Sequence, residues 1–336
     1  MRIYELRGAG LDQLVCVERP MPKPGPGEVL VRVHAVSLNY RDLLIAQGKY
    51  GRGSLRYPLV PVSDGAGEVV EVGAGVTRVA PGDRVAGTFF QNWTEGPFEA
   101  SAGASALGGS IDGVLAEQVV LSAEGVVKFP GDLSFEEAAT LPCAALTAWV
   151  SLVERGQLEP DERVLVMGTG GVSIFALQFA KRLGAQVIVT SRSDEKLARA
   201  KLLGADGLVN THKMPDWDAG VRELTIGRGV DHLIEVGGAE TLQRSLRCLR
   251  DGGHLALVGL LSGAPARRED AENNQRGIRV DSIYVGSRQH FEAMNEAIAR
   301  FQIQPVIDRA FTFEEARAAY EYLASAQHFG KIVIRI

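Results

Sequence analysis

The spacing of apolar and polar residues divides the chain into parts with different predicted structures. In the N-terminal part, segments such as 28–36 (EVLVRVHAV) and 115–122 (LAEQVVLS) alternate with a period of two. This period is typical of strands that bury one face. The segment 65–76 predicts two strand pieces joined at Gly73. We therefore expect a barrel-like β domain over residues 1–128.

From residue 129 the pattern changes to apolar strands that alternate with amphipathic helices. The first helix is predicted over 133–154, and the strands that follow are RVLVM, QVIVT, GLVN, HLIEV, HLALVGLL and RVDSIYV. Units of this kind build a parallel sheet with helices on both faces. The pattern predicts a doubly wound domain over residues 129–286.

The C-terminal segment shows a third pattern. Helices are predicted over 291–301 and 313–325, and KIVIRI at 331–336 predicts a closing strand. We expect this segment to rejoin the β domain, so that this domain comprises residues 1–128 and 287–336, with a cleft between the two domains. The expected fold class is therefore α/β.

A long connection over residues 88–113 interrupts the β pattern. It is rich in Gly, Ala and Ser, and aromatic residues such as Phe90 and Trp93 stand near its start. Long connections are often functional, and aromatic residues at one end favour a segment that covers something. A lid or pocket wall and a mobile surface excursion are both open interpretations.

Composition and charge exclude several classes of protein. Apolar residues make up 46% and charged residues 23% of the chain, and the net charge is −5. These values are typical of a globular protein and give no reason to expect nucleic acid or an anionic membrane as a partner. No apolar stretch approaches the roughly 18 residues of a membrane span, and MRIYELRGAG has no apolar signal segment, so we expect a cytoplasmic protein.

A glycine-rich turn follows the strand RVLVM and opens a helix, which is the setting of a dinucleotide-binding fingerprint. Gly168 permits a tight turn, and Gly170 or Gly171 lets the backbone approach a pyrophosphate held by the helix N-terminus. Ser173 stands where a third glycine is usual and is nearly as small. The expected contacts are Gly168, Thr169, Gly170, Gly171 and Val172. A site for S-adenosylmethionine is the alternative.

The end of the next strand distinguishes between the two nicotinamide dinucleotides. About 20 residues after the turn, an NAD site usually places an acidic residue. This chain has Ser191 and Arg192 there, with Lys196 one helical turn further on. Hydroxyl and guanidinium groups suit a 2′-phosphate, so we expect NADP(H). Lys196 fits equally well as a solvated helix lysine.

Motifs along the whole chain resemble those of the medium-chain dehydrogenase/reductase superfamily. They are LNYRDLL, SDGAGEV, PGDRV, TLPCAALTAW, GTGGVS and GKIVIRI. The resemblance implies a GroES-like catalytic domain and a Rossmann domain. It fits best the zinc-free branch of quinone oxidoreductases and alcohol dehydrogenase-like proteins.

The resemblance also bears on metal binding. Zinc-dependent members carry a cysteine ligand where this chain has Asn39, a His-Glu pair at Ser63-Asp64 and a further cysteine at Cys143. One thiol and one carboxylate do not make a catalytic zinc site. Residues 88–113 replace the cysteine-rich lobe that holds a structural zinc in those relatives. We therefore expect no metal.

The same resemblance implies that Asn39, Asp42 and Tyr50 line the substrate site. Asn39 would donate a hydrogen bond to a substrate oxygen, and Tyr50 a hydrogen bond or a proton. Each has a structural alternative, with Asn39 as a helix cap, Asp42 in the first turn of that helix and Tyr50 in packing. Asp64 either faces the cleft or serves in a turn. Cys143 is expected to be an inert packing residue.

Further cofactor contacts follow from the resemblance and from glycines that stand after apolar strands, at the carboxyl edge of the sheet. In the family, the position of Thr147 lies near the nicotinamide. Val285 and Ser287 lie at the end of the last sheet strand, and Lys331 supplies a charge near the C-terminus. These contacts are Thr147, Gly237, Gly259, Val285, Ser287 and Lys331.

Together these observations predict a zinc-independent, NADP(H)-dependent oxidoreductase. Without a metal, hydrogen-bond donors must polarise the substrate carbonyl, which favours electrophilic small molecules such as quinones and enones. The alternatives are an alcohol or aldehyde dehydrogenase of the same fold and a non-catalytic nucleotide-binding or RNA-binding protein. The acidic charge and the retained Asn39, Asp42 and Tyr50 argue against the last. We expect a homodimer that pairs through the sheet edge formed by HLALVGLL and RVDSIYVG.

Overall fold

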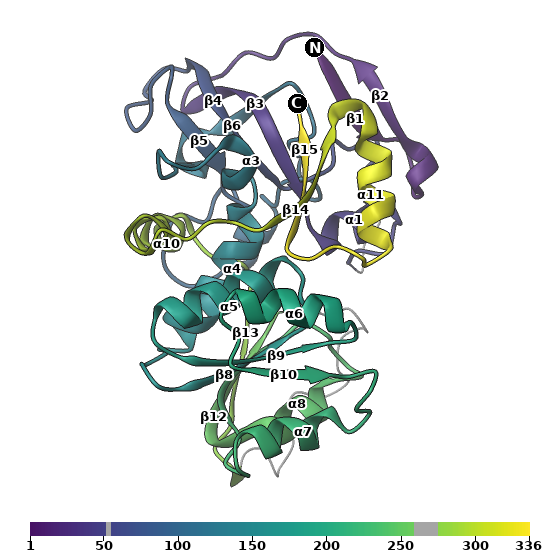
Figure 1. Ribbon diagram of the computed structural model, residues 1–336. Helices are drawn as coiled ribbons and strands as arrows, with labels where there is room; N and C mark the ends of the chain where they lie inside the picture. The colour runs from purple at the N-terminus through teal and green to yellow at the C-terminus, as the bar shows by residue number, and fades with distance from the viewer. Residues whose placement is uncertain (52–54, 259–274) are drawn as a thin grey trace. The chain divides into compact units, whose positions relative to one another are not determined.

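The computed structural model describes residues 1–51, 55–258 and 275–336 (Figure 1). The chain forms two compact units. The first comprises Met1–Leu146 with Val285–Ile336, and the second comprises Thr147–Tyr284. Among the described residues, no helix is both long enough and apolar enough to span a membrane.

Strands dominate the first unit. They are β1 Arg2–Leu6, β2 Leu14–Glu18, β3 Glu28–Leu38, β4 Asp64–Val72, β5 Arg84–Gly87, β6 Gln118–Ser122, β7 Val126–Lys128, β14 Ile307–Thr312 and β15 Lys331–Arg335. One seven-stranded sheet has the order β14-β15-β3-β4-β5-β7, with β6 paired to β3, while β1 and β2 form a separate antiparallel pair. The predicted β fold of this part is confirmed, and β14 and β15 of the C-terminal segment lie in its sheet.

Helices fill the connections of this unit. They are η1 Leu11–Gln13, α1 Tyr40–Ala46, α2 Ala100–Gly103, η2 Ala123–Gly125, α3 Phe135–Ala138, α10 Arg288–Phe301, η5 Phe313–Glu315 and α11 Ala316–Ala324. The helix predicted over 133–154 continues from α3 through π-helical turns, η3 (Leu141–Ala145) and η4 (Val150–Arg155), on either side of α4 (Leu146–Trp149). Pro142 in η3 has no N–H group, so regular α-helical bonding cannot run through it.

Two strand pairings bring the end of β3 beside the beginnings of two other strands. β3 runs antiparallel to β4, with Ser37 opposite Asp64, and antiparallel to β15, with Leu38 opposite Ile332. The residue after β3 therefore lies beside the first residues of β4 and β15, which are Asp64 and Lys331. Three distant parts of the sequence meet at this corner of the sheet.

The segment 65–76 contains one strand and a turn. β4 ends at Val72, and the N–H of Val76 donates to the carbonyl of Gly73 at 3.3 Å. A Cβ atom at Gly73 would lie 1.8 Å from the carbonyl oxygen of Gly25, so only glycine fits there. The prediction of a second strand piece after Gly73 is wrong because the chain turns at that glycine.

The aromatic start of the 88–113 connection packs within the first unit. The ring of Phe90 lies 5.2 Å from that of Phe98 and 6.0 Å from that of Trp93, measured between ring centroids. The carbonyl of Trp93 accepts a hydrogen bond from the N–H of Arg288 at 3.0 Å, which ties the connection to the start of α10. These contacts favour a fixed wall over a mobile excursion.

The second unit is a parallel sheet covered by helices. Its strands are β8 Arg163–Met167, β9 Gln186–Ser191, β10 Gly207–Asn210, β11 Val230–Glu235, β12 Leu249–Leu257 and β13 Arg279–Ser282, and its helices are α5 Gly171–Arg182, α6 Asp194–Leu202, α7 Trp217–Leu224 and α8 Leu242–Cys248. The strand order is β10-β9-β8-β11-β12-β13. In Figure 1, α5 and α6 cover one face of the sheet, and α7 and α8 cover the other.

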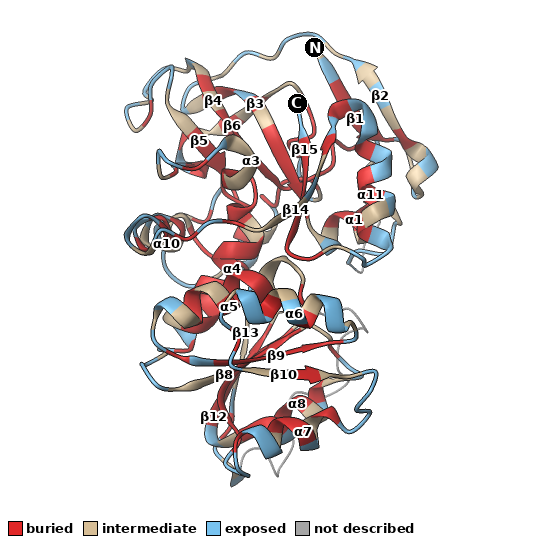
Figure 2. Cartoon of the chain, viewed as in Figure 1, coloured by how far each residue is buried: buried red, intermediate tan, exposed pale blue. Residues whose placement is uncertain are grey.

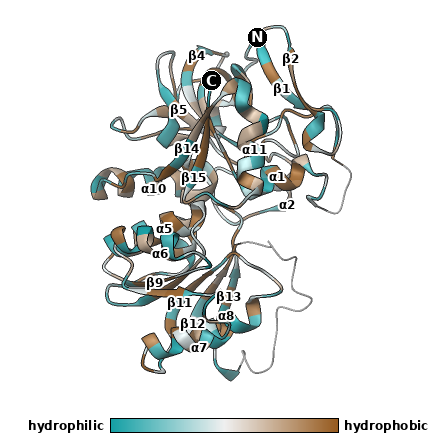
Figure 3. Cartoon of the chain, turned by 45° about the vertical axis from the view of Figure 1, so that its right-hand side comes forward, coloured by the Kyte–Doolittle hydropathy of each residue, from teal (hydrophilic) through white to brown (hydrophobic). Residues whose placement is uncertain are grey.

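Burial explains the sequence pattern of this unit. Every residue of β11 is buried, and the central strands are red in Figure 2. The same strands are largely hydrophobic in Figure 3, as expected for a parallel sheet with both faces covered. The predicted doubly wound domain is therefore confirmed.

Candidate functional site

The turn after β8 has the geometry of a nucleotide-binding loop. Gly168 has a φ of 71°, which residues with a Cβ rarely adopt, and Gly170 is the N-cap of α5. No atom lies within 4 Å of the Cβ position at Gly168 or Gly170, so the backbone is open to a ligand. Thr169, Gly171 and Val172 complete the turn and the start of α5, whose first N–H groups suit an anion.

The topology of the sheet places this turn where ligands bind in related architectures. β8 lies between β9 and β11, so the strand order reverses direction at β8. In open α/β sheets, ligands bind beyond the carboxyl ends of the strands at such a reversal. The turn after β8 is therefore well placed to bind a dinucleotide.

Ser173 fits into the first turn of α5 because its hydroxyl has a partner. The side chain is 2% exposed, and its Oγ donates a hydrogen bond to the carbonyl of Met167 at 2.7 Å. This bond joins the helix to the end of β8. A serine at the usual glycine position therefore keeps the helix against the strand.

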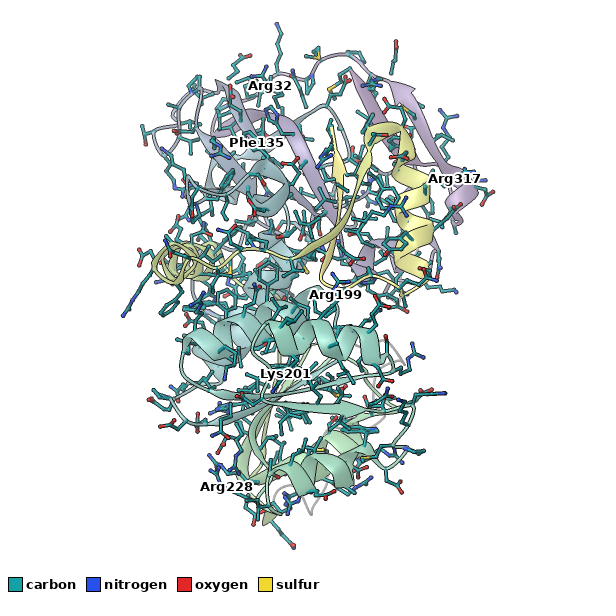
Figure 4. All side chains as sticks on the ribbon, viewed as in Figure 1. Arg32, Phe135, Arg199, Lys201, Arg228 and Arg317 are labelled. Atoms are coloured by element: carbon teal, nitrogen blue, oxygen red, sulfur yellow. The ribbon has the colours of Figure 1, made fainter. Side chains whose placement is uncertain are left out.

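The end of β9 carries hydroxyl groups and no carboxylate. Thr190 Oγ1 accepts a hydrogen bond from the N–H of Gly168 at 3.4 Å, which links the two strand ends. Ser191 Oγ accepts from the N–H of Ser193 at 3.2 Å. Arg192 is exposed and Lys196 is half-buried on α6. Arg199 and Lys201, which are labelled in Figure 4, lie further along the same helix.

A buried glutamate that the sequence analysis did not identify organises the loop after β11. Glu235 is fully buried, and its Oε1 accepts hydrogen bonds from the N–H groups of Gly237 at 2.6 Å and Gly238 at 3.1 Å and from Thr241 Oγ1 at 2.8 Å. A Cβ at Gly237 would lie 2.3 Å from Thr241 Oγ1. The internal packing of the loop thus accounts for Gly237. The sequence does contain a signal for this role, because Glu235 is an acidic residue at the end of an apolar strand and stands just before two glycines.

A second site lies in the first unit, at the corner where β3, β4 and β15 meet. We call it the Asn39 cluster, and it consists of Asn39, Asp42, Asp64, Cys143 and Lys331. Lys331 is 3% exposed, and its Nζ donates hydrogen bonds to Asn39 Oδ1 at 2.6 Å and to the carbonyl of Leu38 at 2.7 Å. The structure therefore pairs Lys331, which the sequence predicts to be a cofactor contact, with Asn39.

Asp42 caps the helix that begins after Asn39. Its Oδ2 accepts a hydrogen bond from the N–H of Asn39 at 2.8 Å, and the side chain is fully buried. Burial raises the pKa of Asp42 to about 6, while the nearby charge of Arg41 acts in the opposite direction. The structure thus favours the capping role for Asp42 and places the carboxyl next to the expected catalytic amide.

Asp64 is the central acceptor of the cluster. Ser63 Oγ donates to its Oδ1 at 2.7 Å, and the N–H of Cys143 donates to its Oδ2 at 3.0 Å. Burial raises the pKa of this carboxyl, and the charge of Lys331 opposes the rise. The carboxyl therefore binds the Ser63 hydroxyl and the backbone of η3.

These residues do not fit a catalytic zinc ion. The oxygen of Asn39 faces an ammonium group, and both oxygens of Asp64 already accept hydrogen bonds. Burial raises the pKa of the Cys143 thiol far above its ordinary value, and Cys143 is the one thiol among these residues. Among the described residues, no group of three or more His, Cys, Asp and Glu side chains is arranged to hold a metal.

Tyr50 lies outside the Asn39 cluster. It is 40% exposed, and its ring centroid is 5.0 Å from the guanidinium carbon of Arg41. The same guanidinium lies 4.6 Å from the ring of Phe89, and its Nη1 donates to the carbonyl of Leu107 at 2.8 Å. The Arg41 side chain therefore links Tyr50 to the aromatic start of the 88–113 connection.

Four further residues are expected to contact the cofactor, and three of them lie within the described residues: Thr147, Val285 and Ser287. Thr147 is 3% exposed, and its carbonyl accepts a hydrogen bond from Ser151 Oγ at 2.7 Å. Val285 has a φ of 54°, and Ser287 caps α10 by accepting a hydrogen bond from the N–H of His290 at 3.3 Å. The cap already uses the Ser287 hydroxyl as an acceptor. Gly259 lies outside the described residues.

Family models match both parts of the chain. The alcohol dehydrogenase GroES-like domain matches residues 25–131, and the zinc-binding dehydrogenase model matches residues 171–300. A zinc-type alcohol dehydrogenase-like protein of Schizosaccharomyces pombe is 44% identical over 335 residues, which cover 98% of this chain and 96% of that relative.

Solved structures match over the same length. One, described as a candidate alcohol dehydrogenase from Sinorhizobium meliloti 1021, has a TM-score of 0.93 and 42% identity, and the match covers 100% of this chain and 98% of that chain. The quinone oxidoreductase of Escherichia coli, solved in complex with NADPH, has a TM-score of 0.84 and 26% identity, with 100% of both chains covered.

Proposed function

The chain belongs to the medium-chain dehydrogenase/reductase superfamily, and on this basis we propose that it is a zinc-independent, NADP(H)-dependent oxidoreductase that acts on an electrophilic carbonyl compound, a quinone or an enone. One observation carries the proposal: Lys331 Nζ lies 2.6 Å from Asn39 Oδ1, at the position where zinc-dependent relatives have a cysteine ligand. With an ammonium group there, hydrogen-bond donors have to polarise the substrate carbonyl.

The proposed cofactor site is the turn after β8 together with the end of β9. The contacts are Gly168, Thr169, Gly170, Gly171, Val172, Ser191, Arg192 and Lys196. The open backbone at Gly170 supports a pyrophosphate there, and the exposed Arg192 supports a 2′-phosphate. The similar quinone oxidoreductase, which binds NADPH, also supports this choice. When bound, the nicotinamide supplies the hydride.

The chain's own residues bind and orient the substrate in this proposal. Asn39 Nδ2 donates a hydrogen bond to the carbonyl oxygen, which becomes more negative as the carbonyl is reduced. The second proposed donor, of a hydrogen bond or a proton, is Tyr50, which lies outside the Asn39 cluster and contacts Arg41. Asp42 accepts a hydrogen bond from the backbone N–H of Asn39. Asp64 interacts favourably with the positive charge of Lys331.

The proposed assembly is a homodimer through the edge of the sheet in the second unit. Among the described residues, β13 is the last strand in the order and pairs with β12 alone. An unpaired strand edge is a template for pairing with a second copy. Light scattering coupled to size-exclusion chromatography tests this proposal, and the mass of a single chain at micromolar concentration would contradict it.

Binding and turnover test the proposed function directly. We expect tighter binding of NADPH than of NADH in a fluorescence titration, and turnover of quinones or enones with saturating NADPH. The alcohol dehydrogenase-like relatives make a dehydrogenase for alcohols or aldehydes the second candidate, so the panel includes both classes. Turnover of simple alcohols with neither quinones nor enones would favour that candidate, and no binding of either nucleotide would contradict both.

A further inference from the structure

We propose that Lys331 is a positioning residue that fixes the orientation of the Asn39 amide and strengthens its Nδ2–H group as a donor to the substrate oxygen. The inference rests on the proposed function, because it assigns Lys331 a role in the same site. It differs from the role that the family resemblance implies for this lysine, which is contact with the cofactor.

The orientation of the amide follows from the chemistry of its partner. An ammonium group carries only donors, so the amide atom that it contacts at 2.6 Å has to be the oxygen. Nδ2 then points the other way. It is buried and forms no hydrogen bond within the described part of the chain.

The nearby Asp64 carboxyl does not use both hydrogens of the Asn39 Nδ2 group. Asn39 is close enough to Asp64 to favour the charged form of that carboxyl, although the two side chains do not meet hydrogen-bond geometry. An amide nitrogen has two hydrogens. If one Nδ2 hydrogen of Asn39 points towards Asp64, the other is available for a ligand.

The main chain of Asn39 is fixed as well as its side chain. Asp42 Oδ2 accepts from its N–H at 2.8 Å, and Lys331 Nζ also binds the preceding carbonyl, that of Leu38, at 2.7 Å. Lys331 itself is held at the start of β15, because its N–H donates to the carbonyl of Val306 at 2.9 Å. The donor is therefore preorganised before substrate binds.

The charge of Lys331 adds to this geometry. A hydrogen bond from a cation withdraws electron density from the amide oxygen and makes the N–H groups of the same amide stronger donors. Lys331 is 3% exposed, so water screens this effect little. Asp64 lies near enough to stabilise the buried cation.

Substitutions of Lys331 separate the hydrogen bond from the charge. Lys331→Gln keeps a donor without the charge, Lys331→Arg keeps the charge, and Lys331→Met removes both. The control is Lys23→Met, because Lys23 is exposed. With a substrate that the native enzyme reduces, we expect Lys331→Met to lower kcat about 100-fold, the loss typical of removing a transition-state donor. KM and the Kd for NADPH should change far less, and Lys331→Arg should recover part of kcat.

The opposite result for cofactor binding would overturn the inference. If Lys331→Met weakens NADPH binding as strongly as it lowers kcat, Lys331 is a cofactor contact. Unchanged kcat in Lys331→Met would also overturn it. Loss of kcat in Lys331→Gln equal to that in Lys331→Met would assign the effect to charge, whereas recovery by Gln would assign it to amide orientation; both outcomes support a positioning role.

A spectroscopic measurement tests the contact without turnover. In protein labelled with 15N-asparagine, the Asn39 side-chain resonance is assigned by its disappearance in Asn39→Asp. We expect Lys331→Met to shift this resonance in the protein without substrate, and Lys23→Met to leave it in place. A resonance that does not move would overturn the inference. If the native protein reduced no quinone or enone, the proposed function would fail while this measurement still reported on the contact.

Discussion

Lys331 and Asn39 are 292 positions apart in the sequence, and their side chains meet at 2.6 Å between Nζ and Oδ1. The pairing of β3 with both β4 and β15 produces this contact. The carboxyls of Asp42 and Asp64 lie beside it, and both have raised pKa values because they are buried.

Asn39→Ala should lower turnover much more than it weakens NADPH binding. The substitution removes the Nδ2 donor, and loss of one such donor typically costs about 100-fold in kcat. Steady-state kinetics and fluorescence titration measure the two effects. Asn92→Ala is the control, because Asn92 is exposed in the same unit. Equal losses in turnover and affinity would leave Asn39 with a structural role only.

Ser191→Asp combined with Arg192→Ile should move the cofactor preference towards NADH. The new carboxylate would repel a 2′-phosphate and accept from a ribose hydroxyl, and the loss of the exposed guanidinium removes its cationic partner. The ratio of kcat/KM for the two cofactors reports the change. Lys201→Met, on the same helix, should leave the ratio unaltered. An unchanged ratio in the double variant would mean that other residues recognise the phosphate.

Ser173→Ala should reduce the free energy of unfolding by about 1 kcal/mol, the typical net value of one buried hydrogen bond. The carbonyl of Met167 would lose the donor that contacts it at 2.7 Å. Denaturant titration measures the loss, and Ser101→Ala provides an exposed serine for comparison. A variant as stable as the native protein would show that the hydroxyl does not hold α5 against β8.

Protein purified from cells grown with added zinc should contain no stoichiometric zinc. The ammonium of Lys331 contacts Asn39 Oδ1, and the other positions of the family's ligands supply one thiol and a carboxylate whose two oxygens already accept hydrogen bonds. Elemental analysis after gel filtration is the measurement, with a zinc-containing alcohol dehydrogenase treated in parallel. One zinc ion per chain would contradict the prediction and, with it, the metal-free function.

The stability of the native protein relative to Asp42→Asn should fall as the pH rises from about 4 to about 6.5. Burial raises the pKa of Asp42 from 3.8 to about 6 on folding, so the folded chain binds this proton more tightly. The advantage is full below the unfolded pKa and is lost as the pH rises through the folded pKa, a change of about 3 kcal/mol.

Asparagine at position 42 keeps an acceptor for the N–H of Asn39, so the comparison isolates the ionisation. Free energies of unfolding from denaturant titrations at several pH values give the difference. Asp132→Asn replaces an exposed carboxyl and serves as the control. A difference that stays constant with pH would show that Asp42 titrates alike in the folded and unfolded chains.

Local patterns were sufficient to predict most of the fold. The period of two predicted β3 and β6, and RVLVM followed by glycines predicted β8 and α5. α7 was not predicted, because it spans only eight residues, Trp217–Leu224, and includes Gly220, a weak helix former. The turn after Gly73 was also missed, since it depends on the close approach of Gly25, which is distant in sequence.

The candidate site was only partly predictable for the same reason. Spacing and resemblance identified Asn39 and Lys331 separately, but their contact depends on strand register across most of the chain. Similarly, Glu235 is a single acidic residue at the end of an apolar strand, and its role depends on donors that the loop brings to it. Pairwise contacts between distant segments leave no trace in one sequence.

The division of the chain into units also has a consequence for biosynthesis. The second unit is one continuous segment, Thr147–Tyr284, whereas the first needs two separate segments of the chain. Ribosomes deliver the N-terminal residues first, and compact units generally fold as they become complete. A newly made chain can therefore form its nucleotide-binding unit before Asn39 meets Lys331. The contact between Asn39 and Lys331 is thus a late step of maturation, reached only after β15 has been added to the sheet.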